Sequence, residues 1–191
     1  TTRQTILDAA RLRFARHGYE GARLSDIAAD VGIRRPSLLY WFPTKAALYE
    51  DTVGEVFSEL EEALVLSLGA AGPFGERIDR AVTALHSTLD GSPAIAALVV
   101  HELGRDGGPG QDILMQRIEP LLAHLEPLLA DSEGRTRTGL PVRSAMLTVV
   151  GGLLIRNATS PGLRDALWGT HSVAATRAIA RSVFLAPESN A

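Results

Sequence analysis

The fold of this chain is indicated most clearly by the stretch Gly32-Ile33-Arg34-Arg35-Pro36-Ser37-Leu38-Leu39-Tyr40-Trp41-Phe42-Pro43-Thr44-Lys45. A glycine turn opens the stretch, a short helix follows with one apolar face and one basic and aromatic face, and a further helix starts at its end. Two short helices joined by a glycine-containing turn form a helix-turn-helix, whose second helix lies in the major groove of DNA. The pattern therefore predicts a recognition helix over residues 35–42 and double-stranded DNA as its partner.

Helices are also predicted on either side of this stretch. Apolar residues at spacings of three and four indicate a helix over residues 3–17, which ends at Gly18 because glycine readily takes the left-handed C-cap conformation. The first helix of the motif is predicted over residues 24–31. Thr44 is a good N-cap for a long helix that begins at Lys45.

The rest of the chain keeps a helical pattern and shows no strand signal. Glycines and a proline over residues 69–75 end the long helix. Pro120 and Pro127 are expected to bend or break one of the later helices. These helices are predicted over residues 76–89, 93–103, 111–130, 142–157 and 170–185, with a polar loop over 132–140 and a helical turn over 161–168. The chain is therefore predicted to have an all-α fold.

Composition excludes several classes of protein. The 191 residues contain no cysteine, which rules out disulfides, thiolate catalysis and cysteine-ligated metals. No apolar run approaches the ~20 residues that a membrane span needs. The first residues, Thr1–Gln4, show no apolar signal-peptide core, so a cytoplasmic protein without membrane contact is expected.

Charge is distributed unevenly along the chain. The formal net charge is −3, yet residues 1–45 carry eight basic and four acidic side chains, and residues 46–191 carry 11 basic and 18 acidic ones. A basic N-terminal part on an acidic body is typical of a protein that presents one end to a polyanion.

The predicted recognition helix offers side chains suited to both bases and phosphates. Arginine can donate two hydrogen bonds to guanine, worth about 1–3 kcal/mol of discrimination. Lys45 lies in the first turn of the next helix, where the helix dipole disfavours a cation and a phosphate would remove the conflict. The alternative is an ordinary solvated face, but the set lies together on one side after a glycine turn. The candidate DNA contacts are Arg34, Arg35, Ser37, Tyr40, Trp41 and Lys45.

From about Ile6 to Val53 the chain resembles the TetR family of bacterial transcriptional regulators. The resemblance covers about a quarter of the chain and keeps register throughout. The matching residues are Ile6-Leu7-Asp8-Ala9-Ala10, Phe14, His17-Gly18-Tyr19, Asp26-Ile27-Ala28, Val31-Gly32-Ile33, Ser37-Leu38, Tyr40, Phe42, Lys45 and Leu48.

The resemblance implies two domains and a dimer. Residues 1–47 would form a three-helix helix-turn-helix DNA-binding domain. Residues 48–191 would form a larger helical ligand-binding and dimerisation domain, and a homodimer would bind a pseudo-palindromic operator. Tyr40 and Lys45 match phosphate-contacting positions of the family. Arg34, Arg35, Ser37 and Trp41 match its base-reading and backbone-reading surface.

The chain departs from the family pattern at two helix starts. Arg23 and Arg34 stand where Ser or Thr usually caps the second and third helices, and an arginine cannot accept the amide hydrogen bond. We expect that these caps are lost in exchange for affinity to phosphate or base, which makes Arg23 a further candidate DNA contact.

The family also implies a dimer interface made by the last two long helices. Residues 142–157 fit because Met146, Val149, Val150, Leu153 and Leu154 are too apolar for solvent, and Gly151-Gly152 permits close approach of another helix. Val173, Ile179, Val183 and Phe184 give the segment 170–185 a similar character. The alternative is a helix buried within one chain.

The effector is expected to be a small, mainly apolar molecule, because the helices of the second domain place few charges inward. Binding of the effector would release the protein from DNA. Repression is the common outcome in the family, and activation is the alternative that the sequence leaves open. Candidate pocket residues are His86, His101, Met115, His124, Asn157 and Trp168, with Glu102 and Arg117 as further polar candidates.

Three other functions remain as alternatives at this stage. Histidines on successive helices could converge on a metal, which would make the protein a metal-sensing regulator or a helical metalloenzyme. A protein partner could replace the small effector. His101-Glu102 begins like a zinc-protease motif, but position 105 is arginine and the second ligand is absent. No catalytic motif is complete, so neither enzymatic activity nor a cofactor is expected.

Overall fold

The computed structural model describes residues 2–130, 134–169 and 173–185, and within them it contains helices and no strand. This confirms the predicted all-α fold. The first three positions of the predicted last helix and the first two of the predicted polar loop lie outside the described residues. The helices are α1 (Thr2–Gly21), α2 (Leu24–Val31), α3 (Arg35–Trp41), α4 (Lys45–Gly69), α5 (Phe74–Gly91), α6 (Pro93–Leu103), α7 (Pro109–Leu129), α8 (Val142–Ala158), α9 (Pro161–Trp168) and α10 (Val173–Phe184).

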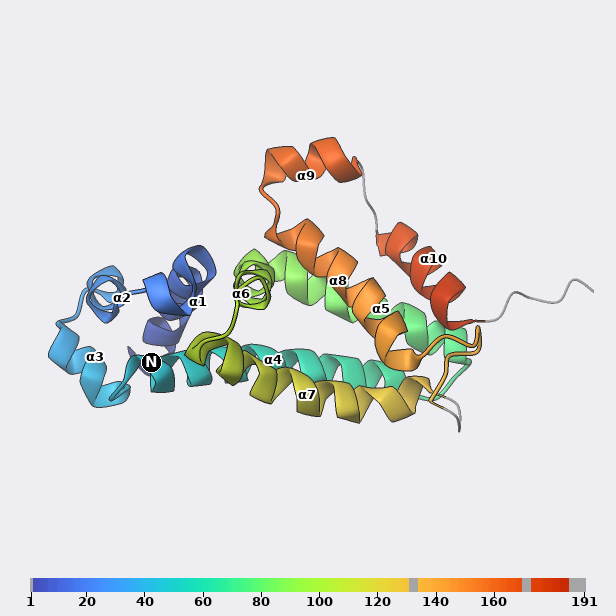
Figure 1. The fold of residues 1–191 in the computed structure, drawn as a ribbon, viewed down its shortest axis with the longest axis horizontal. Helices are drawn as coiled ribbons and strands as arrows, with labels where there is room; N and C mark the ends of the chain where they lie inside the picture. Colours follow the sequence, from blue (N-terminus) through green and yellow to red (C-terminus); the bar gives the residue numbers. More distant parts are fainter. Residues whose placement is uncertain (1, 131–133, 170–172, 186–191) are drawn as a thin grey trace, which may run out of the picture.

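Helices α1 to α3 form a small bundle at one end of the molecule (Figure 1). Phe14, Ile27 and Leu38, one from each helix, are fully buried in its core. Gly32 ends α2 in the left-handed conformation, with φ 74° and ψ 25°, which a residue with a Cβ atom rarely adopts. The turn that follows places α3 across α2 as the second helix of the predicted motif.

The long helix α4 leaves this bundle and runs along the larger domain beside α7 (Figure 1). Its start is fixed by Thr44, whose side chain accepts a hydrogen bond of 3.0 Å from the amide of Ala47, as the sequence predicted. In the larger domain α4 packs against α5 and α7, α6 packs against α8, and α10 packs against α5. The short helix α9 packs against α8 and contributes no buried residue.

Two helices differ from the prediction. Helix α1 continues to Gly21 instead of ending at His17, but Gly18 has φ 64° and ψ −179° and forms a kink inside it. Helix α7 runs through Pro120 and Pro127, so of the predicted bend or break the break does not occur. Each proline removes one backbone hydrogen bond, but α7 buries Leu114, Leu121, Leu125 and Leu129, and this packing holds the helix together.

The apolar residues that the sequence assigned to dimer contact are partly used inside the chain. Met146, Val149 and Leu153 of α8 and Phe184 of α10 are buried in the described chain itself. The opposite side of α8 is exposed and includes Gly152 and Ile155. One face of α8 is therefore buried within the chain, which was the alternative to a dimer contact.

Among the described helices, none combines the length and the apolar character needed to cross a membrane.

Candidate functional site

The outward face of α3 carries the predicted DNA contacts. Arg34, Arg35 and Ser37 are exposed, Tyr40 is 83% exposed and Trp41 is 43% exposed. The rings of Tyr40 and Trp41 meet edge to face with centroids 5.8 Å apart, so each restricts the other's motion. Within the described residues neither Arg34 nor Arg35 forms an ion pair, and both guanidinium groups therefore face solvent without a neutralising partner.

The helix starts lack the usual caps, as expected from the two departures. Arg23 and Arg34 occupy the N-cap positions of α2 and α3 in extended conformations, and neither side chain accepts a cap hydrogen bond. The third amides, those of Asp26 and Ser37, instead donate to the backbone oxygens of Arg23 and Arg34. Exposed helix N-termini favour an anion, because their amides and the helix dipole present positive charge.

A surface groove runs beside α3. It receives cations from three helix starts, with Arg23 before α2, Arg35 in α3 and Lys45 at the start of α4. Cations along one groove complement the phosphate backbone of a duplex. The groove also holds two hydroxyl groups, those of Ser25 and Thr44, which the sequence prediction did not include among the contacts. Its lining residues are Ala22, Arg23, Leu24, Ser25, Arg35, Leu39, Pro43, Thr44 and Lys45.

Lys45 is held from the end of α1. Its Nζ atom donates a hydrogen bond of 3.0 Å to the backbone oxygen of Glu20 and lies 4.7 Å from the ring centroid of Tyr19. These contacts fix the direction of a long, flexible side chain and so reduce the entropy lost when it binds a phosphate.

An ion pair fixes α2 against α1. The guanidinium of Arg13 donates two hydrogen bonds, of 2.5 and 2.7 Å, to the carboxylate of Asp30. The hydrogen bond to Arg13 is the main reason that the pKa of Asp30 lies below its usual value. The bidentate geometry orients the first helix of the motif relative to α1.

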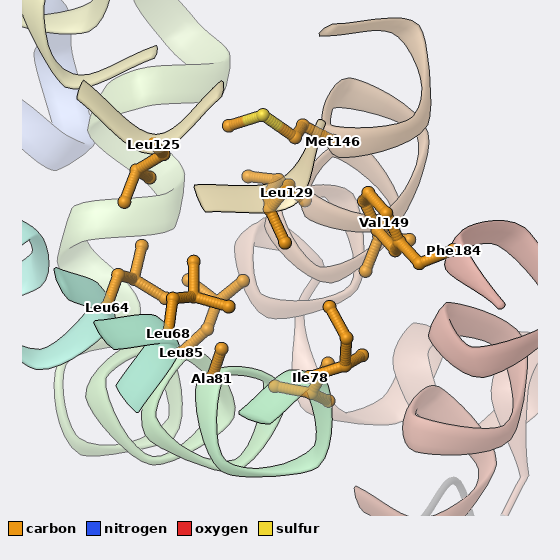
Figure 2. Close-up of a pocket in the computed structure, with 12 residues that line it drawn as sticks. Leu64, Leu68, Ile78, Ala81, Leu85, Leu125, Leu129, Met146, Val149 and Phe184 are labelled. Atoms are coloured by element: carbon orange, nitrogen blue, oxygen red, sulfur yellow. The ribbon is translucent and has the colours of Figure 1, made fainter. Parts of the chain in front are cut away.

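The larger domain contains two adjoining apolar cavities. The smaller has a volume of about 60 Å³, and apolar side chains from α4, α5, α7, α8 and α10 point toward one another across it (Figure 2). The larger has a volume of about 110 Å³ and extends the space toward α6. Every lining side chain of both cavities is apolar. Five residues line both and join them, namely Leu64, Leu85, Leu125, Met146 and Val150.

None of the six candidate pocket residues lines either cavity. Met115 is exposed on α7 and Trp168 lies on α9. His101 lies against Gly18 of α1. Asn157 is buried in α8, where its amide donates to the backbone oxygen of Leu153.

The histidines that the structure describes are not brought together in a metal-binding group. His86 lies 2.9 Å from the carboxylate of Asp90, and His124 lies 2.7 Å from that of Glu61. In the part of the chain that the structure describes, no three histidine or carboxylate side chains gather in a group that could hold a metal ion. The metal-sensing alternative therefore lacks a ligand set among these residues.

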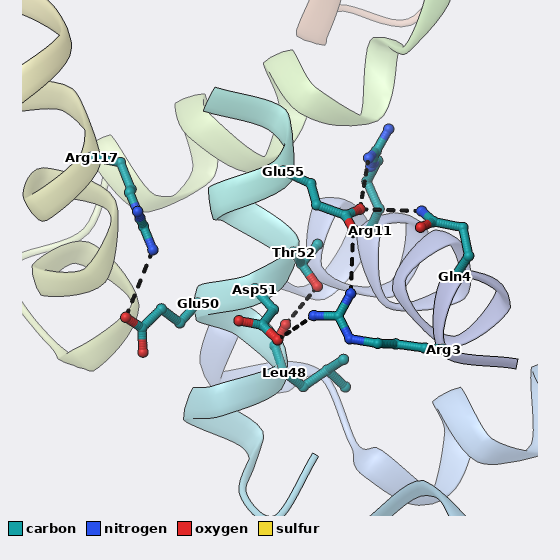
Figure 3. A network of polar contacts seen from close by, with 9 residues as sticks. All are labelled: Arg3, Gln4, Arg11, Leu48, Glu50, Asp51, Thr52, Glu55 and Arg117. Atoms are coloured by element: carbon teal, nitrogen blue, oxygen red, sulfur yellow. Dashed lines mark hydrogen bonds and ion pairs between the residues drawn. The ribbon is translucent and has the colours of Figure 1, made fainter. Parts of the chain in front are cut away.

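Polar contacts attach the small bundle to the start of α4 (Figure 3). Arg3 contacts Asp51 at 2.6 Å and Glu55 at 3.6 Å, and Arg11 contacts Glu55 at 3.9 Å. Since α4 continues into the cavity lining at Val56 and Phe57, this network lies within two turns of the larger cavity.

The two short helices α2 and α3, the second of them basic and exposed, define a helix-turn-helix protein. Residues 6–52 match the family model described as bacterial regulatory proteins, tetR family. A relative in Staphylococcus aureus (strain Newman), the biofilm operon icaADBC HTH-type negative transcriptional regulator IcaR, is 37% identical over 62 residues, which are 32% of this chain and 33% of the relative. The chain therefore spans about a third of the length of the curated relatives that it matches.

Solved structures match over almost the whole chain. FadR from Bacillus subtilis in complex with stearoyl-CoA has a TM-score of 0.73 and 20% identity over 95% of this chain and 97% of that chain. AibR in complex with isovaleryl coenzyme A and operator DNA has a TM-score of 0.73 and 16% identity over 96% of this chain and 98% of that chain. Residues 6–52 are therefore similar to the TetR family of bacterial regulatory proteins, and the solved structures show the same fold over the rest of the chain.

Proposed function

We propose that this chain is a transcriptional regulator that binds a palindromic DNA operator as a homodimer and leaves it when a mainly apolar effector binds. The observation that carries the proposal is the outward face of α3, where Arg34 and Arg35 lie exposed beside Tyr40 and Trp41. Arginines at the N-terminal end of a recognition helix are placed to read guanine, and the flanking groove cations bind phosphates.

The operator can be found by selection from randomised duplexes. We expect enrichment of a palindrome whose half-sites lie about 34–36 Å apart, one helical turn of DNA. Arg35→Ala should weaken binding to the selected site by about tenfold and relax the preference at one base pair. The matched control is Arg137→Ala, since Arg137 stacks on Phe74 far along the chain. Failure to enrich any palindrome would refute the proposal that the protein binds a palindromic operator.

The effector proposed here carries a short acyl chain. The cavities offer only apolar side chains, and such a lining favours a hydrocarbon group over a polar one. Their volumes of about 60 and about 110 Å³ together resemble an engineered cavity of about 150 Å³ that binds benzene, so a chain of about six carbons fits. The fold neighbours bound to stearoyl-CoA and isovaleryl coenzyme A support an acyl group as the apolar part of the effector, while the charged coenzyme A part would lie outside the apolar cavities.

Hexanoyl-CoA is the first compound to test, with coenzyme A as control. Calorimetry should detect binding of hexanoyl-CoA, and its addition should weaken operator binding by about tenfold or more. If coenzyme A bound with the same affinity as hexanoyl-CoA, the proposal that the protein recognises the acyl chain would be refuted.

Homodimerisation is proposed through the exposed sides of α8 and α10. Ile155 of α8 and Ile179 of α10 are each more than half exposed, and a Cβ atom at Gly151 or Gly152 would meet nothing within 4 Å. A second copy can therefore approach α8 closely. Ile155→Asp is expected to shift sedimentation from dimer to monomer, whereas Leu66→Asp, at an equally exposed apolar position of α4, should leave the dimer intact.

Repression is proposed because the relative IcaR is described as a negative transcriptional regulator. A promoter fused to the selected operator should be silent when the protein is present and active when hexanoyl-CoA accumulates. Higher expression in the presence of the protein alone would identify an activator instead.

A further inference from the structure

Glu102 is a buried carboxylate at the junction of the two domains. It is the penultimate residue of α6 and only 1% exposed. Burying a carboxylate is unfavourable unless it is hydrogen-bonded. Its Oε1 atom accepts a hydrogen bond of 2.7 Å from the backbone amide of Tyr19, in α1 of the small bundle. The side chain thus connects the effector domain directly to the backbone of the DNA-binding domain.

Two glycines make the space for this carboxylate. A Cβ atom at Gly110, in the first turn of α7, would lie 2.6 Å from Oε2 of Glu102 and 2.5 Å from Cβ of Tyr19. A Cβ atom at Gly18 would lie 3.2 Å from Oε1 and 2.1 Å from Nε2 of His101. Helices α1, α6 and α7 therefore meet around Glu102 at a distance that side chains would prevent.

The kink in α1 provides the donor. Gly18 leaves the helical conformation with φ 64°, and Tyr19 is the next residue. Its amide is directed to Glu102, and its ring packs edge to face on the buried ring of Tyr49, with centroids 5.1 Å apart. Burial, and then the charge of Glu102, raises the pKa of the Tyr49 hydroxyl. Glu102 is thus part of the packing around Tyr19.

The same short segment of α1 holds Lys45. Tyr19 supplies the ring below Nζ of Lys45, and Glu20 supplies the backbone oxygen that accepts its hydrogen bond. Glu102 therefore binds Tyr19, and Tyr19 and its neighbour Glu20 in turn bind Lys45.

Helix α6 also borders the effector cavity. Its residues Ile95, Val99 and Leu103 line the larger cavity, and Glu102 is the neighbour of Leu103 in the last turn. A rigid helix that is displaced at Leu103 carries Glu102 with it, so the cavity and the α1 contact share one moving part.

We propose that Glu102 is a positioning residue for DNA binding: from α6 it holds Tyr19, and through Tyr19 it places Lys45 for contact with a DNA phosphate. This inference rests on the proposed function, because the contact between Lys45 and phosphate belongs to it. The effector then acts on DNA affinity by moving α6 and withdrawing this support.

A double-mutant cycle on the full-length protein tests the positioning role without any effector. Operator affinity is measured by fluorescence anisotropy at several salt concentrations for wild type, Glu102→Gln, Lys45→Ala and the double variant. Glu102→Gln keeps the size of the side chain and an oxygen that can accept from the Tyr19 amide, but it removes the charge that strengthens this hydrogen bond. It should weaken binding about fivefold, and both single variants should lower the slope of log affinity against log salt by about one contact. The double variant should bind within about twofold of Lys45→Ala, since two residues acting through one contact are not additive.

The outcomes separate the inference from the proposed function. If wild type binds the operator but Glu102→Gln and Gly110→Ala both leave affinity and salt slope unchanged, or their effects add fully to that of Lys45→Ala, the positioning role is refuted while DNA binding stands. If wild type binds no duplex, the proposed function fails and the inference fails with it. Glu126→Gln, in an exposed ion pair with Arg143, is the matched control and should alter neither quantity.

A structural role alone would lower stability without changing the salt slope, so each variant is also melted thermally. Should Glu102→Gln fail to fold, Gly110→Ala serves in its place, because its Cβ atom would overlap both the carboxylate and Cβ of Tyr19 and force their contact to change. It should reproduce the loss of salt slope, and an unchanged slope would overturn the inference. With hexanoyl-CoA added, wild type should lose operator affinity by about tenfold and Glu102→Gln by less than about threefold. An equal loss in both would refute the coupling.

Discussion

Val150 lies where the two apolar cavities meet, since it lines both of them. Replacing Val150 by Phe adds about four side-chain carbons to this space, and each methylene that an acyl chain can no longer bury removes about 0.8 kcal/mol. The loss amounts to about 3 kcal/mol, which predicts roughly a hundredfold weaker binding of hexanoyl-CoA. A shorter chain such as acetyl does not reach the filled volume, so its weak binding should stay unchanged.

Isothermal titration of hexanoyl-CoA into wild type and Val150→Phe measures this difference. Thermal unfolding of the free proteins serves as a check, because filling an existing cavity should leave the melting temperature within a few degrees of wild type. The control is Leu66→Phe, which introduces the same phenyl ring at an exposed position of α4 outside both cavities. Equal affinity of wild type and Val150→Phe for hexanoyl-CoA would show that the acyl chain binds elsewhere.

Three further outcomes are expected. Arg23→Ser should restore a cap to α2 and raise the free energy of unfolding by about 1 kcal/mol. It should also weaken operator binding and lower the slope of log affinity against log salt by about one phosphate contact. An unchanged salt slope in filter binding would contradict the exchange of the cap for DNA affinity. Thr44→Ala removes the side-chain acceptor for the amide of Ala47 and should lower the free energy of unfolding by about 1 kcal/mol in a urea titration, with a smaller effect speaking against this cap. The two hydrogen bonds from Arg181 hold the pKa of Asp79 below its usual value, so their stabilisation is present above the ordinary aspartate pKa and is lost as pH falls through the folded-state pKa. Asp79→Asn should therefore be less stable than wild type by at most about 1 kcal/mol at neutral pH, and the difference should vanish in acid; a difference independent of pH in thermal melts would refute the assignment.

Helix positions followed from the sequence wherever glycine, proline or a capping residue marked an end. Helix α2 begins and ends at the predicted residues, because Gly32 stops it in the only conformation that lets the turn form. The ends of α6 were equally clear, since Pro93 starts the helix and Gly104 follows it. The prolines of α7 misled the prediction, because the energy of burying its leucines against other helices is not visible in local sequence.

The outward-facing side chains of α3 were predictable for a simple reason. On a seven-residue helix, burying Leu38 decides which residues point outward, and Arg35, Tyr40 and Trp41 follow from the helical period. The groove hydroxyls of Ser25 and Thr44 escaped notice because their position depends on how three helix starts meet.

The apolar cavities of the larger domain could not be located in the same way. A leucine that lines a cavity and a leucine that fills a core have the same pattern along a helix, and only the packing of five or six helices separates them. The predicted pocket residues are therefore mostly polar, whereas every residue that lines the two cavities is apolar. Glu102 was among them, and it lies instead between α6 and α1, where Gly18 and Gly110 leave room for it.

A cavity lined only by apolar side chains distinguishes its guests by volume. Each methylene too many or too few changes the binding free energy by only about 1–3 kcal/mol, which is at most a few hundredfold in affinity. Neighbouring members of a homologous series would therefore compete for the same protein at their cellular concentrations. The regulated genes would then respond to the combined concentration of a class of metabolites, each weighted by its affinity for the cavity. Their expression would depend on several compounds and not on one.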